Sequence, residues 1–265
     1  MLTKLVSRSL ITLVLLSSLI SFLKFNHCRN NDFTSPDNYI HACYTDIPTL
    51  FSERGLNTNT FPYLSAANSM EYPPVTGLFA WAISFITPNS SNVLYFDLNI
   101  LFLIMMYFIS ALILKALAPK YLYLFLASPA VIASLFINWD LIAVASALLT
   151  VYFFEKKKYE ESAIALGISI ATKFFPIVML LPIAIIFYRK KQIKQLSRYL
   201  FTTAMLWLAI NLPISAFYSG AKYGLPDNGY VIATLLRVVG VSTFTFILMR
   251  DLAAKSTVKS SVISR

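Results

Sequence analysis

The residues of this sequence that could do chemistry gather in one long polar segment, residues 24–74. This segment holds five of the chain's twelve carboxylates, which are Asp32, Asp37, Asp46, Glu53 and Glu71. A positioned carboxylate can act as a general base that takes a proton from a hydroxyl group and makes it a better nucleophile. A loop of about fifty residues is longer than a connection needs to be, and loops of that length usually carry function.

The rest of the chain is rich in apolar residues. Hydrophobic residues make up 57% of the 265, and only 13% are charged, against about a quarter in a soluble domain. With a mean hydropathy of +0.67, this composition predicts a multi-pass membrane protein, with the lipid bilayer as a partner. The net charge of +10 does not indicate a nucleic-acid partner, because the basic residues cluster in short loops, as in cytoplasmic loops of membrane proteins.

The apolar runs predict an all-α polytopic fold of about eight hydrophobic segments, some of them short or re-entrant. They cover residues 9–23, 75–86, 93–117, 121–137, 141–154, 162–188, 199–217 and 230–249. We expect a single membrane domain over residues 1–250, followed by a disordered polar tail, residues 251–265.

The first run has no small-x-small cleavage site after it, so we expect an uncleaved, rather short first helix with the amino terminus in the cytoplasm. The loop 24–74 then lies outside the cytoplasm. Simple alternation from this helix would place Lys115 and Lys120 outside as well, against the charge rule. The topology between residues 75 and 140 therefore stays open.

The two cysteines of the chain, Cys28 and Cys43, both fall in the exported loop. Outside the cytosol an accessible pair tends to oxidise, so we expect a disulfide between them. The alternative is two unpaired thiols packed on apolar neighbours. With only two scattered histidines, we expect no metal site, and no cofactor motif is present.

The loop continues from Asp46 into a segment with Pro48 near its start and Gly55 at its end. These residues and the helical spacing of the apolar side chains predict a short amphipathic helix that lies in the membrane interface. Asp46 would sit just before its amino terminus. A role as a plain helix cap remains the alternative to a catalytic role.

Two further charged residues fall at membrane depth. Asp140 follows Trp139, a typical interfacial anchor, and helix capping and substrate contact are equally open for this aspartate.

Residues 162–188 lie between two basic loops but are too few for two full spans. We expect a helical hairpin with both ends cytoplasmic and Lys173 near its bend, where a cation needs an anion such as a lipid phosphate.

Several short motifs follow one another in a recognisable order. They are Cys28, Cys43 to Pro48, Arg54-Gly55-Leu56, Pro62-Tyr63, Glu71-Tyr72-Pro73, Thr76-Gly77, Asn138-Trp139-Asp140 and Ala171 to Pro176. Over about residues 1–217 the chain resembles the polyprenol-phosphate-mannose-dependent mannosyltransferases of glycosyltransferase family 87, which have the GT-C fold. Members usually continue through several more helices, so the resemblance implies a C-terminally shortened chain.

The resemblance implies transfer of a sugar, with inversion, from a polyprenyl phosphate to a glycolipid or cell-envelope glycan on the outer face of the plasma membrane. By position, Asp46 matches the general base, and Glu71 is the second candidate. The departing phosphate needs cationic help, for which Arg54 and Lys173 are the candidates. Tyr44, Tyr72, Asn138 and Asp140 would contact the substrate.

Two other function classes fit the same composition. A small-solute transporter or lipid flippase would also have broken helices and charged residues in the membrane. Such proteins normally show paired breaks in repeated halves, and this sequence shows no repeat. A non-catalytic membrane subunit would use the polar loop as a docking surface.

Overall fold

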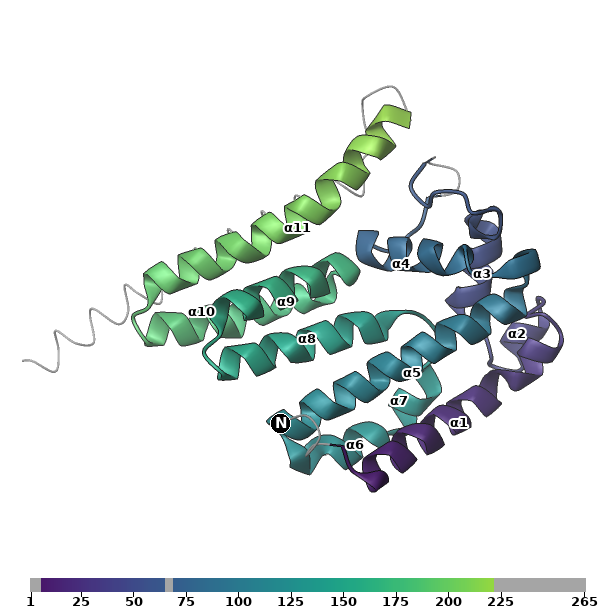
Figure 1. Ribbon diagram of the computed structural model, residues 1–265, viewed down its shortest axis with the longest axis horizontal. Coiled ribbons are helices and arrows are strands. Elements are labelled where there is room, and N and C mark those ends of the chain that lie inside the picture. Colours follow the sequence, from purple (N-terminus) through teal and green to yellow (C-terminus); the bar gives the residue numbers. More distant parts are fainter. Residues whose placement is uncertain (1–5, 65–68, 222–265) are drawn as a thin grey trace, which may run out of the picture.

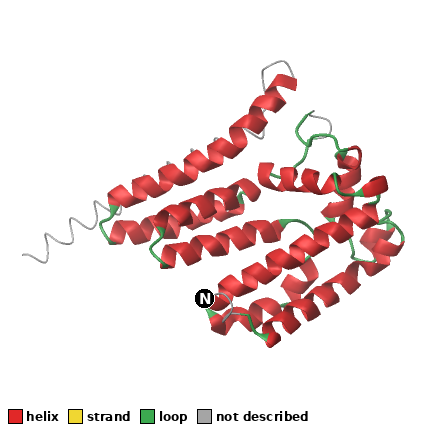
Figure 2. Ribbon diagram, in the orientation of Figure 1, coloured by secondary structure: helices red, strands yellow, loops and turns green. Residues whose placement is uncertain are grey.

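The computed structural model describes residues 6–64 and 69–221, and these residues form helices joined by turns and loops (Figure 1). The α-helices are α1 (Arg8–Asn30), α2 (Asp37–Ile40), α3 (Asp46–Glu53), α4 (Pro74–Ser84), α5 (Asn92–Leu117), α6 (Leu122–Leu126), α7 (Pro129–Ser134), α8 (Asp140–Glu155), α9 (Tyr159–Thr172), α10 (Leu180–Arg189) and α11 (Ile193–Ala221). No strand occurs in the described ranges (Figure 2), which confirms the all-α prediction there. The predicted run 230–249 and the tail 251–265 lie outside them.

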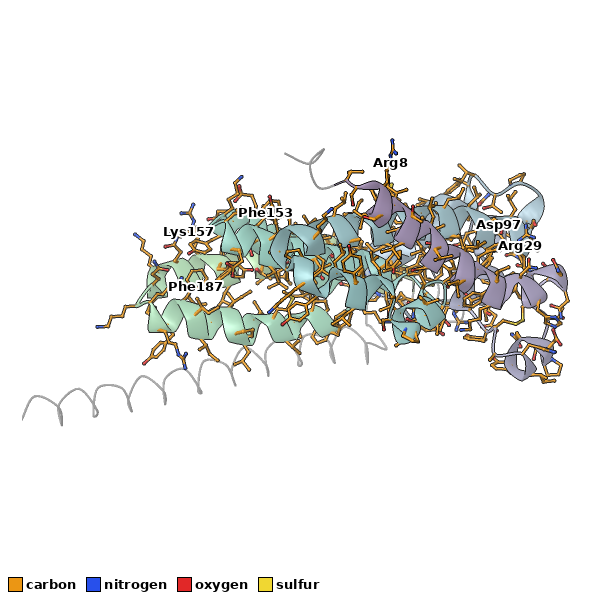
Figure 3. The ribbon with its side chains drawn as sticks, turned by 90° about the horizontal axis from the view of Figure 1, so that it is seen from below. Arg8, Arg29, Asp97, Phe153, Lys157 and Phe187 are labelled. Carbon is orange, nitrogen blue, oxygen red and sulfur yellow. A yellow bond between two sulfur atoms is a disulfide. The ribbon has the colours of Figure 1, made fainter. Side chains whose placement is uncertain are left out.

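The two long apolar helices, α1 and α5, lie antiparallel. Near the end of α1, Arg29 donates from Nε and Nη2 to the two carboxylate oxygens of Asp97, in the second turn of α5, at 2.8 and 2.5 Å (Figure 3). At the other end, Lys115 of α5 donates to the hydroxyl of Ser7, just before α1, at 3.2 Å. The start of α1 and the end of α5 therefore lie at the same end of the molecule.

Fewer helices are both long enough and apolar enough to span a bilayer than the sequence predicts. In the described part of the chain, α1 and α5 meet that condition, and α4 and the segment Phe175–Arg189 are shorter apolar helices. An eleven-residue helix such as α4 rises about 16 Å, roughly half the thickness of the hydrocarbon layer. The expectation of about eight membrane segments is therefore not established. The first helix is longer than expected, because α1 continues past the apolar run, through His27, to Asn30.

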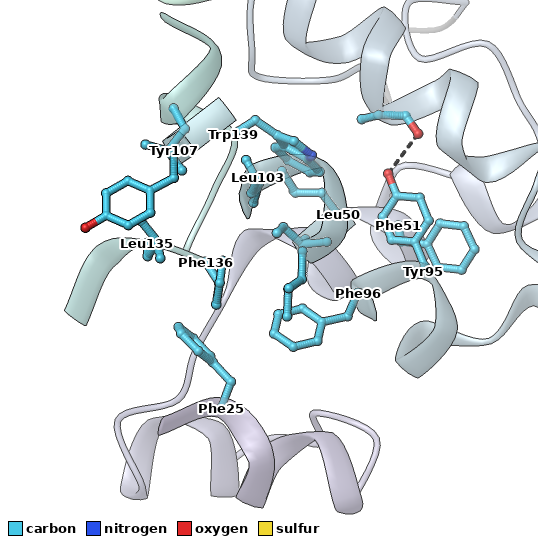
Figure 4. Close-up of a cluster of buried hydrophobic side chains, with 14 of the residues drawn as sticks. Phe25, Leu50, Phe51, Tyr95, Phe96, Leu103, Tyr107, Leu135, Phe136 and Trp139 are labelled. Atoms are coloured by element: carbon cyan, nitrogen blue, oxygen red, sulfur yellow. Dashed lines mark hydrogen bonds between the residues drawn. The ribbon is translucent and has the colours of Figure 1, made fainter. Parts of the chain in front are cut away.

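One apolar core joins α1, α3 and α5 with the segment that precedes α8 (Figure 4). Phe25 packs on Phe96 with ring centroids 5.7 Å apart, and Phe51 stacks on Tyr95 at 4.0 Å. Phe51 belongs to the apolar side of α3, which is buried against the protein. Protein therefore covers the apolar side of α3, and the expectation that this helix lies in the membrane interface stays a prediction.

A second core joins α9, α10 and α11. The Tyr159 ring, at the start of α9, lies 4.9 Å from that of Phe187, near the end of α10, so these two helices form the expected hairpin. The break falls where the sequence predicts it: α9 ends at Thr172, and a 3₁₀ turn, Phe175–Met179, leads into α10. Pro176 in that turn cannot supply the N–H that a continuous helix needs.

The two basic turns of the second half lie together. Arg198 near the start of α11 pairs with Glu160 near the start of α9, with 2.5 Å between Nε and Oε1. Lys157, Lys158 and Lys194 line one shared cavity of about 470 Å³ at this end. Lys157 lies at the opposite end of the molecule from Arg29 (Figure 3).

Candidate active site

The loop that enters α3 is held at two places. A disulfide joins Cys28 to Cys43, both fully buried, with 6.1 Å between their Cα atoms. Next, the Thr45 hydroxyl donates to the carbonyl of Phe136 at 2.8 Å. The backbone N–H of Asp46 donates to the carbonyl of Ile137, also at 2.8 Å. These contacts hold the start of α3 against the segment that leads into α8.

Asp46 is the first residue of α3 and does not cap it. The cap is Thr45, whose hydroxyl accepts from the backbone N–H of Ile47 at 3.3 Å. The Asp46 carboxylate instead accepts from the hydroxyl of Tyr72 at 2.5 Å, and the hydroxyl of Tyr44 also hydrogen-bonds it. A carboxylate has about four acceptor positions, so Asp46 can still accept a hydrogen bond from a further hydroxyl group.

Tyr72 is held on three sides. Its carbonyl accepts from the hydroxyl of Tyr63 at 2.8 Å. Its ring meets that of Trp139 edge to face at 5.6 Å, and the Lys173 ammonium lies 5.1 Å from its centroid. Gly77 is needed here, because a Cβ at this position would lie 1.9 Å from the Tyr63 hydroxyl. The Tyr72 hydroxyl is thus directed at Asp46 by packing around the ring.

Both phenols stay protonated far into the alkaline range. Burial raises the pKa of Tyr72, and the hydrogen bond to the Asp46 carboxylate raises it further. Burial, followed by the charge of Asp46, raises the pKa of Tyr44 to about 12. In each case a phenolate would sit beside a carboxylate, which disfavours the charged form. At physiological pH both side chains are therefore neutral hydrogen-bond donors to Asp46.

A second charged pair lies beside Tyr72. Lys173, at the break after α9, donates from Nζ to Oδ1 of Asp140, the first residue of α8, at 2.5 Å. The Asn138 amide oxygen accepts from the backbone N–H of Asp140 at 3.0 Å. Trp139 stands at the N-cap of α8, which has no side-chain cap, so Asp140 does not cap this helix. The hydroxyl of Thr76, in α4, donates to the carbonyl of Thr172 at 2.7 Å and holds the break in place.

Trp139 is a core residue, and the expectation of an interfacial anchor is wrong. Its side chain is 1% exposed, and its indole N–H donates to the amide oxygen of Asn99 at 2.7 Å. Asn99 lies fully buried in α5. Asn99 could not be recognised as part of the site from the sequence, because this hydrogen bond joins residues forty positions apart and no local pattern marks it.

The structure joins six of the expected site residues into one cluster. They are Tyr44, Asp46, Tyr72, Asn138, Asp140 and Lys173. Arg54 and Glu71 form a separate ion pair with each other. Arg54 follows the last residue of α3, about 12 Å along the helix from Asp46. The cluster combines a carboxylate with free acceptor capacity, two neutral phenols and a cation near a second carboxylate.

Comparison with known families adds one finding. The family model Mannosyltransferase (PIG-M) matches residues 133–225, which is less than half of the chain. The matched segment contains Asn138, Asp140 and Lys173, and the loop with Asp46 precedes it. The match supports a glycosyltransferase of the mannosyltransferase type. Searches of curated proteins and of solved structures found no match.

This match also bears on the cellular setting. Together with the two long apolar helices α1 and α5, it indicates a membrane protein.

Proposed function

We propose that this protein is a GT-C membrane glycosyltransferase of the family 87 type. It takes mannose from a polyprenyl phosphate and transfers it, with inversion, to a hydroxyl group of a glycolipid or cell-envelope glycan. One observation carries this proposal. The Asp46 carboxylate, held by two phenols, lies in one contact cluster with the Lys173–Asp140 pair, and that pair belongs to the segment that matches the mannosyltransferase model.

Asp46 is the general base in this proposal. The acceptor oxygen attacks the anomeric carbon, the bond from that carbon to the phosphate oxygen breaks, and the phosphate leaves with the bonding electrons. The acceptor proton passes to the Asp46 carboxylate. A positioned base typically contributes about 10²- to 10⁴-fold to the rate. Tyr72 and Tyr44 hold the carboxylate in place while its remaining acceptor positions face the acceptor hydroxyl.

Lys173 stabilises the departing phosphate. Its ammonium has three donors, and Asp140 accepts from one of them, so further N–H groups are available to phosphate oxygens. Asp140 then positions the cation, and Asn138 holds the start of the helix that carries Asp140. Arg54 is a second cation for the phosphate or for the acceptor, with Glu71 as its partner.

We also propose a topology that resolves the conflict over residues 75–140. Here α1 crosses outward, α4 is too short to cross, and α5 returns, which places Lys115 on the same side as the amino terminus. The turns that carry Lys157 and Lys194 lie at the end of the molecule opposite Arg29. By the positive-inside rule the basic ends are cytoplasmic, so the cluster around Asp46 faces the outer side of the plasma membrane.

A donor assay tests this function. The purified protein, reconstituted in liposomes, is supplied with radiolabelled polyprenyl-phosphate mannose and a lipid extract as acceptor, with a nucleotide-linked mannose in a parallel reaction. The proposal predicts labelled glycolipid from the polyprenyl donor and none from the nucleotide donor. Transfer from the nucleotide donor alone would contradict it. A variant with Lys173→Gln and Asp140→Asn serves as the control for background transfer.

A further inference from the structure

The chain's only two histidines lie side by side and share one carboxylate, outside the cluster around Asp46. Nε2 of His27 lies 2.8 Å from Oδ2 of Asp37, and Nδ1 of His41 lies 2.9 Å from Oδ1 of the same residue. The two imidazole centroids are 4.0 Å apart. The histidines are therefore not scattered, as the sequence had suggested, because the fold brings them together.

The three side chains supply the donor atoms that zinc prefers. Two imidazole nitrogens and one carboxylate oxygen lie within 4.8 Å of one another. Zinc binds such atoms at about 2.0–2.2 Å, so in a tetrahedral site the ligands lie about 3.4 Å from one another. The distances from Asp37 to the histidines, 2.8 and 2.9 Å, need to widen by only about half an ångström to admit an ion.

The scaffold around these groups is already in place. His27 lies in the last turn of α1, while Asp37 begins α2 and His41 follows it by four residues, on the same face. The disulfide between Cys28 and Cys43 joins the two segments directly beside the histidines. Covalent closure holds the donor atoms close together before any ion binds, which reduces the entropy lost on binding.

A neighbouring amide also orients the carboxylate. The side-chain amide of Asn31 donates to Oδ2 of Asp37. Hydrogen bonds of this kind fix the direction of metal-binding carboxylates, and their loss typically costs about 10- to 100-fold in metal affinity. Asn31 thus gives a way to test metal binding without removing a ligand.

We propose that His27, Asp37 and His41 form a binding site for a divalent transition-metal ion of the zinc type, with a water molecule in the fourth position. The ion links the end of α1 to α2 and stabilises the polar loop next to the disulfide. The charges agree with this role, because one carboxylate and two neutral imidazoles leave a site that attracts a dication. The proposal does not depend on sugar transfer, since none of its residues belongs to the cluster around Asp46.

A zinc titration of the full chain tests the proposal. The protein is purified without a polyhistidine tag, stripped with EDTA, exchanged into detergent buffer and titrated with zinc chloride against a chromophoric chelator. The expected result is saturable binding of one zinc ion per chain. His27→Gln and His41→Gln should each abolish this binding, and Asn31→Ala should weaken it about 10- to 100-fold. Asp32→Asn is the matched control, an exposed carboxylate of the same loop that accepts from Asn92 and should leave binding unchanged.

Cobalt provides a second measurement on the same samples. Cobalt bound in place of zinc should give the intense visible absorption of a four-coordinate site in the unmodified protein and not in the histidine variants. Thiol labelling under denaturing conditions verifies that each variant retains the disulfide. The unmodified protein has no other histidine and no free cysteine. Absence of saturable binding, or binding that persists in both histidine variants, would overturn the proposal.

Discussion

Replacing Tyr72 by phenylalanine is the mildest change that tests whether the Asp46 carboxylate must be held in place. Phenylalanine keeps the ring against Trp139 and next to the Lys173 ammonium, and only the hydroxyl that donates to Asp46 at 2.5 Å is lost. A hydrogen bond to a charged group contributes about 1.5–3 kcal/mol. If this hydrogen bond contributes its full free energy in the transition state, removing it lowers the rate about 10- to 150-fold.

The assay measures initial rates of mannose transfer over a range of polyprenyl-phosphate-mannose concentrations. Because Tyr72 contacts the base, kcat should fall by that factor while the donor KM stays close to that of the unmodified protein. Tyr123→Phe is the control, since Tyr123 is an exposed tyrosine in α6. A Tyr72→Phe protein with unchanged kcat would refute the idea that this hydroxyl holds the base. The double variant Tyr44→Phe/Tyr72→Phe should be slower than either single variant, since both phenols contact Asp46.

Three further predictions concern stability in detergent. Replacing both Cys28 and Cys43 by serine opens a closed loop of fifteen residues and should lower the free energy of unfolding by about 3 kcal/mol. In thermal unfolding followed by tryptophan fluorescence, Tm should fall by roughly 6–12 °C. An unchanged Tm would contradict this prediction. A double-mutant cycle of Lys173→Gln and Asp140→Asn should give a coupling free energy of about 1 kcal/mol, because solvent partly screens two side chains that are each roughly a third exposed. Additive effects of the two substitutions on stability would refute the pairing. The raised pKa of Tyr44 stabilises the folded protein fully below pH 10, and this contribution is lost between pH 10 and about 12. Tyr44→Phe should therefore reduce the loss of stability in that window, and an identical pH profile would contradict the assignment.

Local features of the chain were predictable from the sequence. Proline marks the break before α7 at Pro129 and the break after α9 at Pro176, because proline cannot donate the backbone hydrogen bond that a helix needs. The pairing of Cys28 with Cys43 follows from their count and their position in a single polar loop. The loop itself could be identified by its polarity, and it does supply the carboxylate of the candidate site.

Contacts between distant helices were not predictable in the same way. The bonds from Tyr72 to Asp46 and from Lys173 to Asp140 join residues 26 and 33 positions apart, and they depend on how four helix ends meet. What covers the apolar side of α3 was not predictable from the sequence either. An apolar stripe predicts that a helix face is buried, but not whether lipid or protein buries it, and here α5 covers it.

The topology of residues 75–140 cannot be obtained by taking every apolar run as one membrane crossing. Counting each apolar run as a crossing placed Lys115 outside, against the charge rule, although the run 75–86 is too short to span a bilayer. In the structure Lys115 contacts Ser7, at the end of the molecule where α1 begins. The histidine cluster was hidden for another reason. His27 and His41 are fourteen residues apart in the sequence, and their rings meet in the fold beside the disulfide that joins the two segments.

The most direct test of the central claim is the turnover of Asp46→Asn. Asparagine has a similar shape and can keep the contact with Tyr72, but it cannot accept a proton from the sugar acceptor. The variant should insert into the membrane, bind the polyprenyl donor and transfer mannose at least about a hundred times more slowly than the unmodified protein. Glu71→Gln, which removes the other candidate carboxylate, should retain most of the rate. Near-normal turnover by Asp46→Asn would contradict the account and leave Glu71 as the candidate base.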